Sequence, residues 1–117
     1  MSSAGLSVFV FGIYLVLAGL GFTFIPDTSL GMFGLPAAQE PWIRVVGWLM
    51  VLIGYYYIQT GRNDIRQFFT WTVQVRVSVF LIFILFYFLN WAPAVLLIFG
   101  TIDLLGAIWT FFAQRAK

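Results

Sequence analysis

The feature that most constrains this chain is a run of about 21 residues, Gly5 to Ile25, that carries no charge. An α-helix of about 20 apolar residues rises about 30 Å, which matches the hydrocarbon thickness of a bilayer. Only 9% of the 117 residues are charged and 62% are hydrophobic, whereas soluble domains carry about 25% charge. The composition therefore excludes a water-soluble globule and predicts an integral membrane protein.

Three more apolar runs follow the first, and short connections separate most of them. The first run is expected to be a retained helix, because Met1 to Ala4 lacks the basic residues of a cleavable signal peptide. Short connections force consecutive helices to run antiparallel. The sequence thus predicts an all-α, antiparallel four-helix transmembrane bundle that forms a single domain over residues 1–117, with helices at about 5–25, 42–60, 65–89 and 93–113.

The longest connection, residues 26–41, is rich in Leu, Met and Phe between Gly and Pro. Such a segment favours a short amphipathic turn in the membrane interface, and an ordinary apolar loop is the alternative. At the start of the third helix, Asp64 and Gln67 have the spacing of a capping box.

The basic residues near the helix ends predict the orientation. Arg62, Arg66, Arg115 and Lys117 fall on one side, whereas only Arg44 flanks the other. Because basic residues are enriched on the cytoplasmic side of membrane proteins, we expect both termini of this multi-pass chain to be cytoplasmic.

Cysteine and histidine are both absent. Their absence argues against disulfides, thiol chemistry, the usual zinc sites and imidazole-held haem, so we expect no metal and no cofactor. The few basic residues form no cluster or stripe of the kind that binds nucleic acid, and we expect no nucleic-acid partner.

Glycines recur every seven residues in the first two long helices, at Gly5, Gly12 and Gly19 and then at Gly47, Gly54 and Gly61. Seven residues return nearly to the same helix face. Small residues let membrane helices approach closely, so these two helices should pack directly. The residues expected at helix contacts are Gly12, Gly19, Gly47, Gly54, Gly100 and Gly106.

Two opposite charges lie deep in the third and fourth helices. Asp103 is about ten residues from either end of its helix, where an ionised carboxylate is costly unless it has a partner. Arg76 lies at nearly the same height, so an intramembrane ion pair of Arg76 and Asp103 is predicted. Arg44 is expected to pair with Glu40 four residues earlier; alternatively, Arg44 turns inward and forms a string of charges with Asp103 and Arg76.

These residues lead to two functional hypotheses. The first is a non-catalytic integral membrane protein, an accessory or oligomerising subunit that packs laterally in a larger membrane complex and contacts the lipid bilayer. The alternative is a small transporter or lipophile-binding protein in which Asp103 acts with Arg76 or Arg44, and Arg44 or Glu40 contacts a head group of a lipid or quinone-like ligand. We expect no enzyme, because hydroxyls such as Ser78, Thr101 and Tyr87 have no activating base nearby in sequence.

The order of these features resembles a family. A first helix that ends at Pro26, the apolar Gly34-Leu35-Pro36, then Trp42-Ile43-Arg44-Val45-Val46-Gly47 and an arginine inside the third helix are similar to small bacterial four-helix membrane proteins of the DoxX-like kind. Some members were proposed as partners of respiratory quinol oxidases. The resemblance implies the bacterial inner membrane and an accessory role, and it carries over no catalytic residue.

Overall fold

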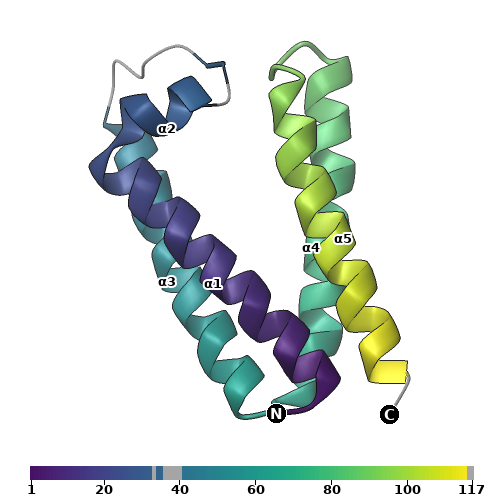
Figure 1. Cartoon of the computed structure of the whole chain (residues 1–117). Coiled ribbons are helices and arrows are strands. Elements are labelled where there is room, and N and C mark those ends of the chain that lie inside the picture. The colour runs from purple at the N-terminus through teal and green to yellow at the C-terminus, as the bar shows by residue number, and fades with distance from the viewer. Residues whose placement is uncertain (33, 36–40, 116–117) are drawn as a thin grey trace. The chain divides into compact units, whose positions relative to one another are not determined.

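A computed structural model describes residues 1–32, 34–35 and 41–115, and these are all-α. The described residues form two compact units: residues 9–59 make one, and residues 1–8 together with those from 60 onward make the other. The described part of the chain holds five helices (Figure 1), which are α1 (Ser3–Phe24), α2 (Pro26–Met32), α3 (Trp42–Arg62), α4 (Arg66–Phe88) and α5 (Val95–Arg115).

Three of the described helices, α1, α4 and α5, are long and apolar enough to cross a membrane. They indicate a multi-pass membrane protein and imply contact with lipid. The helix α3 has the length of a span but is not among these candidates. It carries Arg44 and Arg62 together with three consecutive tyrosines, so its composition is more polar than that of the other long helices. The structure therefore shows three candidate spans among the described helices, and the four-span bundle expected from the sequence is not shown.

The four long helices begin and end within two residues of their predicted bounds. The connection 26–41 contains the seven-residue helix α2, in which Pro26 and Leu30 are buried. Proline suits the first turn of a helix because its missing N–H needs no partner there. Two residues used in the predictions lie outside the described part of the chain: Glu40, the expected partner of Arg44, and Lys117, one of the basic residues that predict the orientation.

A serine cap starts α1. The Ser2 hydroxyl oxygen accepts a hydrogen bond from the Gly5 backbone N–H at 3.0 Å, which is the usual N-cap geometry. In two of the connections between helices the backbone enters the left-handed region. Asp64 has φ 49° between α3 and α4, and Asn90 has φ 61° between α4 and α5. Asp and Asn tolerate this conformation better than most residues.

Helices α1 and α3 contact each other through their glycines. In the unit of residues 9–59, a Cβ added at Gly12 would lie 2.8 Å from the Gly54 carbonyl oxygen, and one at Gly19 would lie 2.5 Å from that of Gly47. In the other unit, a Cβ at Gly5 would lie 2.6 Å from the Gly61 carbonyl oxygen. The heptad glycines thus lie where the two backbones meet, in antiparallel register, as their spacing predicts.

Helices α4 and α5 form a hairpin and pack against each other (Figure 1). Gly100 on α5 is buried, and a Cβ there would lie 3.2 Å from the Phe83 ring. Phe69 on α4 and Ala107 on α5 are buried, and Gly106 is half-buried. The small residues of α5 let the rings of α4 lie close to its backbone.

Candidate functional site

A cluster of buried polar side chains lies in the unit that combines residues 1–8 with those from 60 onward. Its members come from three helices, and each is at most 3% exposed. Such groups are costly to bury in an apolar surrounding unless they are hydrogen-bonded. We call this the buried polar cluster; it consists of Ser7 on α1, Thr72 and Arg76 on α4, and Thr110 on α5.

The hydrogen bonds of the cluster run in one direction. The Arg76 Nη2 donates to Thr110 Oγ1 at 2.9 Å. Ser7 Oγ donates its single proton to the Ala4 carbonyl at 2.7 Å, so the 2.6 Å contact between Ser7 Oγ and Thr110 Oγ1 requires the threonine hydroxyl to donate. The chain from Arg76 through Thr110 and Ser7 to Ala4 therefore links α4, α5 and α1, and each bond in such a chain polarises the next.

A longer contact joins Arg76 to its own helix. Its Nε donates to the Thr72 carbonyl oxygen at 3.4 Å, which is beyond the usual range for such bonds. The guanidinium stays protonated in proteins, and the hydroxyl protons of Ser7 and Thr110 are used within the chain of hydrogen bonds. The cluster is thus arranged to hold a charge and to join three helices.

Asp103 lies on α5 seven residues before Thr110, on the same helix face, and is half-buried. The charge of Arg76 interacts electrostatically with its carboxyl group. The side-chain hydrogen bonds described above for Arg76 go to Thr110 and Thr72. Direct contact of Arg76 with Asp103 as an ion pair stays a prediction.

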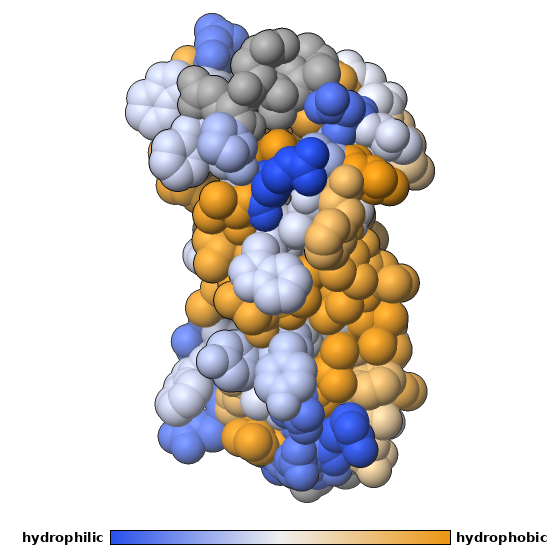
Figure 2. All heavy atoms as spheres, turned by 90° about the vertical axis from the view of Figure 1, so that its left-hand side faces the viewer, coloured by the Kyte–Doolittle hydropathy of each residue, from blue (hydrophilic) through white to orange (hydrophobic). Residues whose placement is uncertain are grey.

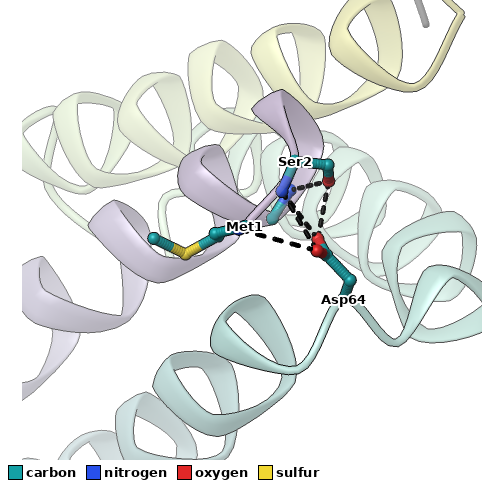
Figure 3. Close-up of polar contacts among 4 residues, drawn as sticks. Met1, Ser2 and Asp64 are labelled. Carbon is teal, nitrogen blue, oxygen red and sulfur yellow. Dashed lines mark hydrogen bonds and ion pairs between the residues drawn. The ribbon is translucent and has the colours of Figure 1, made fainter.

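A second polar site ties the start of α1 to the turn between α3 and α4 (Figure 3). The Asp64 carboxylate accepts three hydrogen bonds from Ser2: one from the hydroxyl at 2.6 Å and two from the backbone N–H at 3.0 and 3.1 Å. The amino group of Met1 lies 4.0 Å from Asp64 Oδ2. We call this contact of Ser2 and Asp64 the N-terminal clamp.

The hydrogen bonds of the clamp stabilise the charged carboxylate. The hydroxyl of Ser2 first, and its backbone N–H second, lower the pKa of Asp64 below the usual value of 3.8. The capping box expected from Asp64 and Gln67 is wrong: the residue before α4 is Ile65, which makes no side-chain cap. The carboxylate contacts Ser2 instead.

Arg44 contacts the end of α1 in the unit of residues 9–59. Its Nη1 donates to the Thr23 carbonyl oxygen at 2.7 Å, in the last turn of α1, where carbonyl groups lack helical partners and a cation is favourable. The predicted partner Glu40 lies outside the described residues. The site of Arg44 belongs to a different unit from Arg76 and Asp103.

Sequence reasoning found Arg76 and its burial but missed the hydroxyl partners. Thr110 carried a signal, because a spacing of seven residues from Asp103 places it on the same face of α5. Thr72, four residues before Arg76, shares the arginine's face in the same way. Ser7 carried none, since nothing in an uncharged helix distinguishes one serine from another.

Comparisons with known proteins identify no family for this chain. The chain matches no protein-family model, and no curated protein or solved structure matches it.

Proposed function

We propose that this chain is a non-catalytic subunit of the bacterial inner membrane, with both termini cytoplasmic, that packs laterally against other membrane helices as an accessory or oligomerising component. In this proposal α3 crosses the membrane together with α1, α4 and α5. The DoxX-like resemblance agrees with this location and role.

The observation that carries the proposal is the chain of hydrogen bonds from Arg76 Nη2 through Thr110 and Ser7 to the Ala4 carbonyl. The buried polar groups bond to one another across α1, α4 and α5. A site that binds and releases a ligand keeps polar groups available to it, whereas Nη2 of Arg76 and the hydroxyls of Thr110 and Ser7 are engaged in bonds within and between the helices. These interior hydrogen bonds thus hold the helices together, and contacts with lipid or other proteins are made by the outer surface.

The outer surface is suited to lipid and to other helices. Figure 2 shows the side on which α1 and α3 lie: hydrophobic residues predominate in its middle, with residues of intermediate hydropathy among them, and hydrophilic residues gather toward its two ends. On α4 and α5, two exposed hydroxyls bond to their own helix, Ser78 to the Val75 carbonyl and Thr101 to the Leu97 carbonyl. Hydroxyls satisfied in this way do not prevent a helix from facing an apolar partner.

One observation favours the alternative of a transporter or lipophile-binding protein. Asp103 is half-buried beside the charge of Arg76, and an ionisable group within a span is often part of a substrate or proton path. A shallow depression on α5 is lined by Leu97, Ile98, Thr101 and Ile102. It contains no ionisable residue, so it gives a ligand no charged anchor.

Native mass spectrometry of the full chain, extracted with its membrane in a mild detergent, tests the proposal. We expect a complex heavier than the 13.3 kDa of one chain, made of several copies or of this chain with other membrane subunits in fixed ratio. The Asp103→Asn variant should give the same complex, with Thr101→Val as the control for an altered polar group on α5. A monomer that takes up a lipophilic dye in a manner that Asp103→Asn abolishes would contradict the proposal and support the alternative.

A further inference from the structure

One face of α4 is exposed along its whole length at a regular spacing. Seven of its residues, alternately four and three positions apart, are exposed. A spacing that averages 3.5 residues is the one at which two helices stay in contact as they wind around each other. We call this stripe the α4 seam; it consists of Gln67, Trp71, Gln74, Ser78, Leu81, Leu85 and Phe88.

The α4 seam lies opposite the side of α4 that is buried in its own unit. Phe69, Thr72 and Arg76 are the buried residues of this helix, and at 100° per residue they point about 180° away from the seam. The seam is therefore the face of α4 that its own unit leaves uncovered.

Gln74 is the unusual member of the α4 seam. It lies about 12 Å along the axis from Arg66, well inside the candidate span. Its side chain is exposed and makes no hydrogen bond within the described residues. By contrast, Ser78, which is exposed one turn further along the helix, donates to the Val75 carbonyl. A primary amide in hydrocarbon without a partner is costly, so the amide of Gln74 calls for a partner that the described residues of its own unit do not supply.

The chemistry of the amide indicates which partner fits. An amide has both a donor and an acceptor, so two glutamines can bond to each other reciprocally. Two copies of the chain inserted with the same orientation place their α4 helices parallel and at the same depth. A two-fold axis along the membrane normal then sets Gln74 against Gln74 of the second copy, and apolar Leu81 and Leu85 continue the contact along the same seam.

We infer that the α4 seam is the contact surface between two copies of this chain, with the Gln74 amides hydrogen-bonded across the two-fold axis. This inference rests on the proposed lateral packing and names a second copy as the partner. A buried polar residue at a heptad contact position can fix the register and the number of helices that associate, and Gln74 has this role in the dimer.

The chain contains no cysteine, so any disulfide between copies must form at the single cysteine that is introduced. Leu81 on the seam and Leu105 on α5 are both 60% exposed and make a matched pair. The full chain carrying Leu81→Cys or Leu105→Cys is placed in vesicles of phosphatidylethanolamine and phosphatidylglycerol and treated with a mild oxidant. We expect Leu81→Cys to form a disulfide-linked dimer, in which two thiols lose their hydrogens to the oxidant, and Leu105→Cys to remain mainly monomeric.

The amide itself is tested by energy transfer between labelled copies in the same vesicles. Gln74→Leu should raise the dissociation constant of the dimer about tenfold, as expected for one hydrogen-bonded amide pair in a membrane. Gln74→Asn keeps a self-complementary amide and should retain most of the affinity. Circular dichroism shows whether each variant keeps its helices.

Equal cross-linking of Leu81→Cys and Leu105→Cys would overturn the inference, as would an unchanged dissociation constant for a folded Gln74→Leu. If the chain is found in a fixed complex with other subunits while Leu81→Cys does not cross-link, the self-association fails and lateral packing stands. A monomer in both experiments would overturn both proposals.

Discussion

The hydroxyl oxygens of Ser7 and Thr110 lie 2.6 Å apart although 103 positions separate the two residues in the chain. Neither residue is more than 1% exposed. The contact joins the first turns of α1 to the last turns of α5, and through Arg76 it includes α4. A single hydroxyl pair thus connects the two ends of the chain in the same unit.

Removing the hydroxyl of Thr110 should destabilise this unit. Thr110→Val preserves the shape of the side chain but takes away the acceptor of Arg76 Nη2 and the donor to Ser7. Leaving a buried donor unsatisfied costs about 2 kcal/mol, measured as the free energy of unfolding by denaturant titration in detergent. Ser78→Ala is the control, because that hydroxyl is exposed and bonds only to its own helix. An equal free energy of unfolding for Thr110→Val and the unmodified chain would show that the chain of hydrogen bonds does not stabilise the fold.

A double-mutant cycle tests the ion pair predicted between Arg76 and Asp103. Asp103→Asn leaves the arginine charge buried without a counter-charge and should cost about 3 kcal/mol. Combining it with Arg76→Gln should cost less than the sum of the two single changes, because the second change removes the charge that the first left alone. Strictly additive losses of unfolding free energy would mean that the two side chains do not interact.

The N-terminal clamp should open in acid. The lowered pKa of Asp64 means that its carboxylate is more stable in the folded than in the unfolded chain. The clamp's contribution is therefore fully present above the usual aspartate pKa and is lost as the pH falls through the lower pKa of the folded state. Hydrogen exchange of the Gly5 amide, whose acceptor is the Ser2 hydroxyl, should accelerate there relative to amides in the middle of α1.

The variant Asp64→Asn should show the same faster exchange at neutral pH, because a neutral amide is a weaker acceptor than a carboxylate. Asp27→Asn is the matched control, since Asp27 is an exposed aspartate in the first turn of α2 and should leave Gly5 exchange unchanged. Unaltered protection in Asp64→Asn would mean that the clamp does not hold the start of α1.

A methyl group at the α1–α3 contact should force the helices apart. In Gly12→Ala the new Cβ would lie 2.8 Å from the Gly54 carbonyl oxygen and 2.9 Å from the Ile58 backbone nitrogen, and backbone atoms cannot turn away as a side chain can. Overpacking of this kind costs about 2 kcal/mol, measured by thermal unfolding in detergent. Gly31→Ala in α2 meets nothing within 4 Å and should change stability by less than about 1 kcal/mol. A Gly12→Ala protein as stable as Gly31→Ala would contradict the close packing.

Patterns along the chain predicted the long helices and the glycine contact, because hydrophobic length and heptad spacing are local properties. The same patterns failed at the polar contacts. Asp64 was assigned to a capping box, yet its partner Ser2 is 62 positions away, and no local spacing encodes such a distance. Thr110 lay on the face of Asp103, but only the packing of three helices reveals that it accepts from Arg76 and donates to Ser7. The polarity of α3 was also underestimated, since its arginines at both ends and its tyrosines reduce its hydrophobicity as a span.

The paired glycines of α1 and α3 have a consequence for the order of events during synthesis. The ribosome completes α1 before it makes α3, and at about 5–20 residues per second α1 spends a few seconds with its bare backbone groove open. The glycines of α3 lie in the matching antiparallel register and let its backbone approach that groove closely. The segment that fits the nascent first helix thus follows it in the same polypeptide.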